Sequence, residues 1–250
     1  QANNVETETV RVKTRFSGEY EGTIQLANAS AHVNGNLATT QRDFDTSMEV
    51  VLDEDVRSKA DTEALGILPG DFVCVEPRFT VTKKGYIKSR FLDDKASAAV
   101  LLALAKYIRD ENVTCKRSIW IAFTVYEEIG HGGASGFPEG LTEMMSVDMG
   151  CVGEGLTCTE RQVSICAKDG GGPYNYDCVT NLIQAAKKVG ADYAVDVYHY
   201  YSSDVDVSLR AGYDVRHSLI GPGVYASHGY ERTHIDGLTN TFDLLEAYLF

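Results

Sequence analysis

The hydrophobic pattern changes character near residue 88, and this change divides the chain into two parts with different predicted folds. Up to residue 88, short segments of alternating polarity are separated by turns that contain Gly and Asn. A period of two residues is typical of half-buried strands, so this part is predicted to form a small β-barrel or sandwich. The predicted strands cover residues 10–16, 22–26, 47–51, 72–75 and 79–82, and residues 57–65 are predicted to form a short helix.

From residue 89 to residue 250, helical and strand patterns alternate. Helices are predicted over residues 94–109, 174–189 and 240–249, and strands over residues 118–125, 145–147, 163–167, 194–198 and 215–220. Such alternation is typical of an α/β domain in which helices flank a largely parallel sheet. Ligands of such domains gather at the carboxyl ends of the strands. The chain is therefore predicted to have a β-rich domain over residues 1–88 and an α/β domain over residues 89–250.

The composition supports a globular protein and excludes two classes of partner. Of the 250 residues, 44% are hydrophobic and 24% are charged, as in ordinary globular domains. The net charge of −13 argues against binding to nucleic acid or to an anionic membrane surface, both of which attract basic proteins. No run of about 18 apolar residues is present, so no membrane-spanning helix is predicted. We expect a cytoplasmic protein.

Two adjacent glutamates, Glu127 and Glu128, end the predicted strand over residues 118–125. Desolvation and charge repulsion both oppose placing two ionised carboxylates at such a position. A bound metal ion would remove this objection, because its positive charge stabilises carboxylates in a dry site. One glutamate would then bind the metal while the other handles a proton. The alternative is a solvated strand end at which both acids face water.

Three further places supply metal-binding side chains. Asp93 and Asp94 open the predicted helix over residues 94–109, Asp148 follows a short strand, and His228 lies in a loop near the C-terminus. Each has an ordinary alternative, because Asp is a common helix N-cap and a lone loop histidine is usually a surface residue. Together they offer oxygen and nitrogen donors that suit a hydrolytic two-metal site. In such a site a carboxylate that binds no metal acts as the general base.

Several segments carry a resemblance to a known family. Residues 65–71 read LGILPGD and look like the family segment LGI..GD, and residues 89–95 read SRFLDDK and look like SR.LDDR. Residues 124–130, TVYEEIG, look like TVQEEVG and are the most specific match. Val147 and Asp148 look like part of AIDV, and Ser203 and Asp204 like part of GTDA. Gly221 and Pro222, followed by His228, look like the ending GP…HS..E. The chain thus resembles the tetrahedral and glutamyl-type aminopeptidases, which are cocatalytic dizinc exopeptidases.

The resemblance implies a fold, cofactors and a role for each candidate residue. The implied fold is a phosphorylase/hydrolase-like mixed sheet flanked by helices, with a β-barrel insertion that serves dimerisation. The implied cofactors are two divalent ions, zinc or alternatively cobalt or manganese. The implied roles are Asp93 as the ligand that bridges both metals, Asp94 as a residue that orients a ligand after a cis Asp93–Asp94 bond, Glu127 as the general base, Glu128 and Asp148 as ligands of one metal each, and His228 as the last ligand, with His234 as its weaker competitor.

One departure from the family pattern bears on the metal site. The family takes a fifth ligand from an upstream H-x-D motif, but no such motif precedes Asp93, and His32 is the only earlier histidine. We therefore expect that the chain lacks the family's N-terminal segment, including a central strand and one metal ligand. A truncated site of this kind is expected to hold fewer metals and to be inactive.

The predicted activity is the release of N-terminal residues from short peptides by a metal-activated water, in an enzyme that forms homo-oligomers. Two alternatives stay open at this point. One is an acyl-amino-acid deacylase on the same fold. The other is a non-catalytic binding or assembly subunit, which would keep the fold without the reaction.

Overall fold

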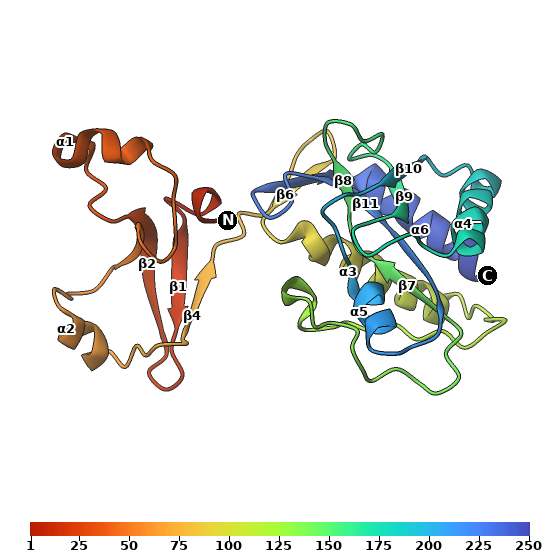
Figure 1. Cartoon of the computed structure of the whole chain (residues 1–250), viewed down its shortest axis with the longest axis horizontal. Coiled ribbons are helices and arrows are strands. Elements are labelled where there is room, and N and C mark those ends of the chain that lie inside the picture. Colours follow the sequence, from red (N-terminus) through yellow and green to blue (C-terminus); the bar gives the residue numbers. More distant parts are fainter. The chain divides into compact units, whose positions relative to one another are not determined.

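The structure is a computed structural model that describes the backbone of the chain and the side chains of residues 1–36 and 39–250. It contains two compact units, Gln1–Arg78 and Phe79–Phe250 (Figure 1). The smaller unit is an antiparallel sheet in the order β3-β2-β1-β4. Its strands are β1 (Thr9–Lys13), β2 (Glu19–Leu26), β3 (Met48–Leu52) and β4 (Phe72–Val75). Alternation explains β1, which buries Val10 and Val12 and exposes the residues between them.

The described strands of the smaller unit form an open sheet, so the predicted closed barrel is not confirmed. Strands β3 and β4 are the two edges, and closure would require them to pair. Four strands of four to eight residues make only one short layer. The connections between them hold α1 (Ala31–Asn34), η2 (Gly35–Thr39) and α2 (Lys59–Ala64), and η1 (Ala2–Asn4) precedes β1. Helix α2 is the short helix that the sequence predicted.

The larger unit is built on a mixed sheet in the order β10-β9-β11-β12-β6-β5, with β7 and β8 also paired to β11. Strands β7 and β8 run parallel to β11, whereas β9 and β12 run antiparallel to it. The sheet is therefore less parallel than the helix–strand alternation predicted. Its strands are β5 (Thr80–Val81), β6 (Tyr86–Ser89), β7 (Glu143–Val147), β8 (Gly150–Val152), β9 (Val163–Lys168), β10 (Tyr193–Val197), β11 (Arg216–Tyr225) and β12 (Glu231–His234).

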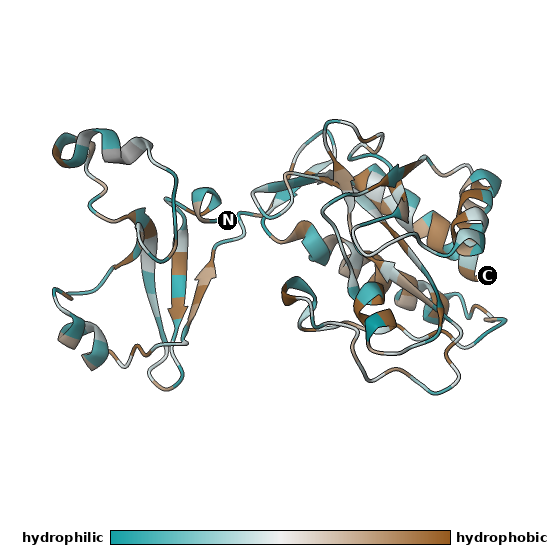
Figure 2. Ribbon diagram, viewed as in Figure 1, coloured by the Kyte–Doolittle hydropathy of each residue, from teal (hydrophilic) through white to brown (hydrophobic). Residues whose placement is uncertain are grey.

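Helices cover both faces of this sheet. Helices α3 (Leu92–Asp110), α4 (Tyr176–Val189) and α6 (Ile235–Leu249) enclose the main core with the side chains of β9 and β11. Figure 2 shows the hydrophobic residues that α6 and the neighbouring strands contribute to this layer. Helix α5 (Asp204–Arg210) packs on the other face through Val205. No helix among the described residues is long and apolar enough to span a membrane.

The boundary between the two units lies at Arg78, ten residues before the change in hydrophobic pattern. Strands β5 and β6 belong to the larger unit because β6 pairs with β12, which lies near the C-terminus. This antiparallel register matches Glu231 with Ser89 and His234 with Tyr86. The segment that forms β12 has the sequence pattern of a loop. The sequence therefore did not predict the pairing of β6 with β12, which makes β6 part of the larger sheet.

Residues 118–125 were predicted to form a buried strand, and this prediction is wrong. The segment has neither helix nor strand, and Trp120, Phe123 and Val125 are 69%, 52% and 85% exposed. An apolar run becomes a strand only when its backbone groups pair with a neighbouring strand. None of the described strands pairs with this segment. It is followed by one short turn of 3-10 helix, η3 (Glu127–Ile129), which carries both glutamates.

Candidate metal centre

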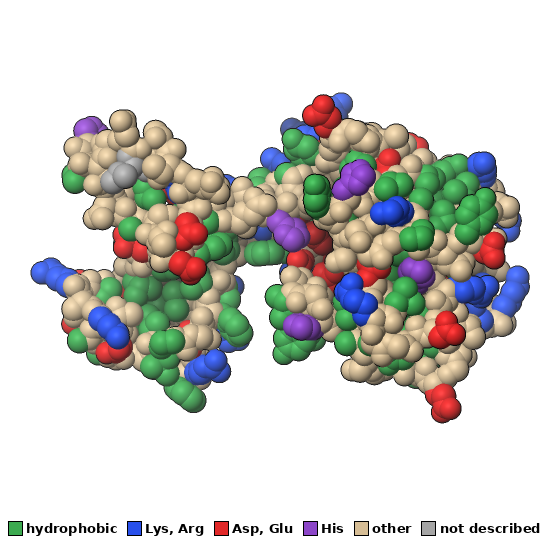
Figure 3. Space-filling view, in the orientation of Figure 1, with side chains coloured by type: hydrophobic (Ala, Val, Ile, Leu, Met, Phe, Trp, Pro, Cys, Tyr) green, Lys and Arg blue, Asp and Glu red, His purple; other side chains and the backbone are tan. Residues whose placement is uncertain are grey.

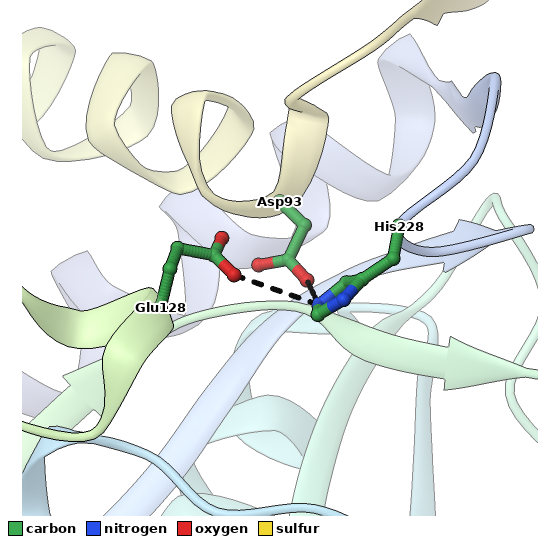
Figure 4. Close-up of side chains that lie close together, drawn as sticks. All are labelled: Asp93, Glu128 and His228. Atoms are coloured by element: carbon green, nitrogen blue, oxygen red, sulfur yellow. Dashed lines mark ion pairs between the residues drawn. The ribbon is translucent and has the colours of Figure 1, made fainter. Parts of the chain in front are cut away.

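Three side chains from distant parts of the larger unit meet at one point. Asp93 lies in the first turn of α3, Glu128 lies in η3, and His228 lies in the loop between β11 and β12 (Figure 4). The His228 Nε2 atom is 3.3 Å from Asp93 Oδ2 and 3.6 Å from Glu128 Oε2. One ligand atom from each of the three residues lies within 4.8 Å of the others, a spacing that can hold a metal ion.

A second group with the same spacing contains Asp93, Asp94 and Asp148. Asp148 lies between β7 and β8. Asp93 is a member of both groups. A carboxylate that binds two metal ions at once would be shared between two ligand groups in the same way. The structure thus brings together all the candidate ligands that the sequence singled out, in two groups that share the Asp93 carboxylate.

The backbone at the start of α3 places two carboxylates side by side. The Asp93–Asp94 peptide bond is cis, as the family resemblance implied. Both residues have non-helical backbone angles, and Phe91 before them is left-handed, with φ of 63°. The Asp94 Oδ1 atom is buried and has no hydrogen-bond partner among the described residues. An unpaired buried oxygen beside two other carboxylates indicates a site that accepts a cation.

Asp148 is held from two sides. Its Oδ1 accepts the backbone N–H of Met149 at 2.7 Å, and its Oδ2 accepts the hydroxyl of Ser203 at 2.6 Å. Ser203 is itself fixed as the N-cap of α5, where it forms a capping box with Asp206. The hydroxyl of Ser97 in α3 donates to the Asp148 backbone carbonyl. These bonds leave the Asp148 carboxylate with one orientation.

Glu231 is the residue that sequence reasoning missed. It is only 1% exposed, and its carboxylate accepts the backbone N–H of Asp93 at 3.0 Å and that of His228 at 2.8 Å. The available signal was a lone glutamate three residues after His228, to which no role was assigned. Its position lets one carboxylate fix the backbone of two candidate ligands.

Burial and mutual repulsion raise the pKa values of the clustered acids. The pKa of Asp93 rises to about 8, first because the side chain is desolvated and then because Asp148 and Glu128 lie nearby. Desolvation also raises the pKa of Glu127 to about 8, and the charges of Asp148 and Asp204 add to it. Figure 3 shows acidic side chains gathered beside a histidine on this face of the larger unit. In the absence of a cation these acids therefore tend to hold protons, and a bound cation would favour their charged forms.

The two neighbouring glutamates lie in different surroundings. Glu128 faces His228, whereas Glu127 is half-buried and close enough to Asp148 and Asp204 for their charges to affect it. The chain turns back at Gly132, where a Cβ atom would collide with the Asp204 carboxylate and would lie 2.9 Å from the Glu127 Cα. A glycine is therefore required for the close approach that sets the position of Glu127.

His234 does not join the cluster. Its Nε2 lies 2.7 Å from the Lys84 carbonyl oxygen, and its Nδ1 accepts the backbone N–H of Asp236 as the N-cap of α6. The ring is 3% exposed and packs edge-on against Tyr86 at 4.9 Å. Its contacts are those of a structural histidine, so of the two candidates it is His228 that lies beside the acids.

The donor set fits divalent cations, because carboxylate and imidazole groups are the ligands that zinc and similar metals accept in proteins. An α/β domain that gathers such ligands beside a further glutamate is typical of metal-dependent hydrolases. The chain belongs to the M42 glutamyl aminopeptidase family, which matches residues 1–244. The peptidases of this family are metal-dependent. Membership supports a peptide hydrolase and does not favour the deacylase or the non-catalytic subunit.

Related proteins agree with this assignment. The chain is 43% identical over 247 residues to YhfE of Bacillus subtilis, whose name assigns it provisionally to the aminopeptidases, and the match covers 99% of this chain and 71% of YhfE. The fold is similar to that of a TET aminopeptidase from a thaumarchaeal marine sediment archaeon, with a TM-score of 0.85 and 16% identity. It is also similar to the Pyrococcus horikoshii TET1 peptidase, with a TM-score of 0.81 and 20% identity. Both matches cover 100% of this chain, and 71% and 74% of the respective structures.

Proposed function

We propose that this protein is a metal-dependent aminopeptidase that removes N-terminal residues from short peptides at a site with two metal ions. The observation that carries the proposal is the position of Asp93, which belongs to both groups of closely spaced ligand atoms. A shared carboxylate of this kind is a feature of two-metal hydrolytic sites. Membership of the M42 family supports the same reaction.

In the proposed site, Asp93 is the shared ligand. Glu128 and His228 are the other ligands of one group, and Asp148 is the other ligand of the second group. Asp94 does not bind metal in this proposal but orients a ligand. Divalent ions bound there would supply the positive charge that polarises a peptide carbonyl and makes a water molecule more acidic. Zinc, cobalt and manganese all accept this donor set. Ser203 and Glu231 would keep Asp148 and the Asp93 backbone in place through the hydrogen bonds described above.

Glu127 is the proposed general base. It lies next to the ligand Glu128 but belongs to neither group of ligand atoms. A pKa raised by burial suits a carboxylate that must first accept a proton and then release it. Glu127 would take a proton from the attacking water and deliver it to the amine nitrogen of the leaving peptide.

The charge of the acid cluster also suits peptides with a free N-terminus as substrates. A peptide presents a positively charged amine at its N-terminus, and the negative potential of the clustered acids attracts such a group. The smaller unit is proposed to serve assembly into a homo-oligomer. Support comes from similar structures, one of which is described as a dodecamer and another as a tetrahedron or a large octahedral shell.

A metal analysis combined with an activity assay tests the proposal. We expect elemental analysis to find zinc-like ions bound to the chain, and fewer in Glu128→Ala. About two ions per chain would mean that another donor takes the place of the missing upstream histidine, whereas one ion or none would mean that the site of this chain is incomplete. Hydrolysis of aminoacyl p-nitroanilides should stop on chelation and return when metal is added. Glu127→Gln should keep its metal and lose about 10²–10⁴-fold in kcat. Glu154→Gln, on an exposed loop, is the matched control. Chelator-resistant hydrolysis, or a fully metallated protein without activity on any aminoacyl substrate, would contradict the proposal.

A further inference from the structure

Two buried carboxyl groups meet between the loop after β9 and the start of α5. Asp169, the first residue of this loop, is 0% exposed, and Asp206, in the first turn of α5, is 6% exposed. Their side chains are hydrogen-bonded to each other. Two ionised carboxylates in such contact would repel each other, and both would lack hydration. A buried pair of this kind therefore holds one proton between its two members.

The hydrogen bonds around the pair indicate which of the two carries this proton. Both oxygens of Asp169 accept bonds, because Oδ1 accepts the backbone N–H of Gly171 at 2.8 Å and Oδ2 accepts the Tyr174 hydroxyl at 2.6 Å. In Asp206, Oδ2 accepts the backbone N–H of Ser203 at 3.1 Å, which leaves Oδ1 free to carry a proton. The Asp206 carboxyl can therefore be neutral and donate to the Asp169 carboxylate.

The surroundings of Asp206 agree with a neutral carboxyl group. Desolvation raises the pKa of Asp206 to about 6, the backbone N–H of Ser203 lowers it in part, and the charge of Asp169 raises it again. The other titratable or charged groups that face the pair are Arg210 on α5, Cys166 and Lys168 on β9, Tyr174 before α4, and His217 on β11. The thiol, hydroxyl and imidazole among them are uncharged near neutral pH, because burial raises the pKa of the first two and lowers that of the third.

A short series of hydrogen bonds connects this pair with Asp148. Asp206 accepts the backbone N–H of Ser203, and the Ser203 side chain accepts the backbone N–H of Asp206, which together form the capping box of α5. The Ser203 hydroxyl donates to Asp148 Oδ2 at 2.6 Å. Ser203 is 3% exposed, so water does not take the place of these bonds. The position of the Asp206 side chain therefore affects the position of the donor that orients Asp148.

The loop after β9 also fixes the segment that precedes α5. Its Gly170 N–H donates to the Tyr201 carbonyl oxygen at 2.9 Å, and the Tyr201 hydroxyl donates to the Met149 carbonyl oxygen at 3.0 Å. A Cβ atom on Gly171 would lie only 2.5 Å from Asp206 Oδ1, so glycine is required for this close approach. The loop thus holds the segment before α5 through a backbone bond and α5 itself through the carboxyl pair.

We propose that Asp169 and Asp206 share one proton, which Asp206 carries, and that this pair positions Ser203 and, through it, Asp148. Asp169 and Asp206 are positioning residues, because neither belongs to a group of closely spaced ligand atoms. The shared proton does not depend on the proposed function. The effect on Asp148 as a metal ligand rests on that function, so the two parts are tested by separate measurements.

Asparagine substitutions in the chelated protein test where the proton lies. Asp206→Asn keeps an oxygen for the Ser203 N–H and offers an amide N–H to Asp169, so it should resemble the protonated acid and fold as well as the unmodified chain at about pH 5. Asp169→Asn turns an amide N–H toward one of two donors. Its equilibrium constant for folding, measured with urea, should fall by about 10- to 100-fold. Equal losses in the two variants would overturn the assignment of the proton to Asp206.

The pH dependence of stability is a measurement that a merely structural role would not change. The pKa of Asp206 is about 6 in the folded protein and about 4 in the unfolded chain, so the stabilisation is complete below about pH 4 and is lost as pH rises to about 6. Asp206→Asn keeps it at every pH. The folding constant of Asp206→Asn, divided by that of the unmodified chain, should rise by about 10- to 100-fold between about pH 4 and 7. This ratio cancels the contribution of the metal-binding acids, which both proteins contain.

Asp177→Asn is the matched control, because Asp177 lies in the first turn of α4 and is exposed. Its ratio to the unmodified chain should show no such rise. A ratio for Asp206→Asn that stays as flat as that of the control would overturn the shared proton.

Zinc affinity, measured by competition with a chromogenic chelator, tests the positioning of Asp148. Asp206→Ala removes the acceptor of the Ser203 N–H and should bind zinc at least about tenfold more weakly, whereas Asp206→Asn should restore the affinity. If Asp206→Ala does not fold, Asp169→Asn takes its place in this comparison. Unchanged affinity in the disrupted variant would overturn the positioning role. If the unmodified chain binds no zinc, the proposed function fails, and the pH dependence still decides whether the proton is shared.

Discussion

Glu231 accepts the backbone N–H of Asp93 at 3.0 Å, although 138 residues separate the two in the sequence. The other oxygen of the same carboxylate accepts the backbone N–H of His228 at 2.8 Å. Since Asp93 and His228 are proposed ligands, one buried side chain fixes the relative position of two parts of the metal centre. Residues that orient metal ligands in this way are often as important for affinity as the ligands themselves.

Glu231→Gln should weaken metal binding without unfolding the protein. An amide has only one accepting oxygen, so one of the two backbone N–H groups loses its partner and meets a donor instead. We expect metal affinity to fall by about 10- to 100-fold, as measured by competition with a chromogenic chelator. Glu154→Gln on an exposed loop should bind metal normally. Unchanged affinity in Glu231→Gln would show that this carboxylate only supports the fold.

Ser203→Ala should disturb Asp148 in a similar way. It removes the hydroxyl that donates to Asp148 Oδ2 at 2.6 Å and also the side-chain cap of α5. Because both groups are buried, we expect a loss of about 1–3 kcal/mol in the free energy of unfolding, measured with urea. Metal affinity should also fall, and Ser203→Thr should restore both. The neighbouring Ser202 is exposed, so Ser202→Ala is the control. A stable Ser203→Ala protein with normal affinity would refute this role.

The candidate site was largely predictable because its ligands lie in short local motifs. Asp93 and Asp94 precede a helix with clear apolar spacing, and Asp148 follows a short apolar strand that the structure confirms as β7. A role for Glu231 was harder to predict, because one of the backbone N–H groups that it accepts belongs to Asp93, which is remote in sequence. In the sequence, His234 is a weaker competitor of His228 for the last ligand position, and this ranking rests on the family motif alone. The contact of His234 with Lys84 and its cap on α6 supply a physical distinction between the two.

Strands were predicted well where alternation was strong and poorly where pairing decided the outcome. β1 to β4 follow the alternating segments, and β9 and β10 follow apolar runs. Residues 118–125 are equally apolar but remain unpaired, because no described strand lies against them. The short strands β6 and β12 show the opposite case, since each is stabilised by the other despite a weak pattern. Local sequence reports the tendency of a segment, whereas the sheet decides whether a partner is present.

The two histidines near the C-terminus should respond differently to substitution. His228 is 58% exposed in its side chain and lies beside Asp93 and Glu128, so His228→Ala should lose bound metal with little change in stability. His234 is buried and caps α6, so His234→Ala should lose about 0.5–2 kcal/mol in the free energy of unfolding and keep its metal. Elemental analysis and urea denaturation of both variants check this. The reverse pattern would move the ligand role to His234.

The stability of the metal-free protein should fall as pH rises. The pKa values of Asp93 and Glu127 are about 8 in the folded protein, compared with about 4 for unperturbed carboxyl groups. Between these values the folded state binds more protons than the unfolded state, so the stabilisation is complete below about pH 4 and is lost as pH rises to about 8. Divalent ions replace these protons, so their stabilising effect should grow over the same range.

Thermal unfolding of the chelated protein between about pH 5 and 8, with and without added zinc, measures both effects. Glu127→Gln removes one of the two titrating groups, so its stability in the absence of metal should depend less steeply on pH than that of the unmodified protein. Zinc should still stabilise this variant, because Glu127 is not a proposed ligand. If chelated Glu127→Gln and the unmodified protein show the same pH dependence, Glu127 does not titrate in this range. Its proposed role as a base with a raised pKa would then be wrong.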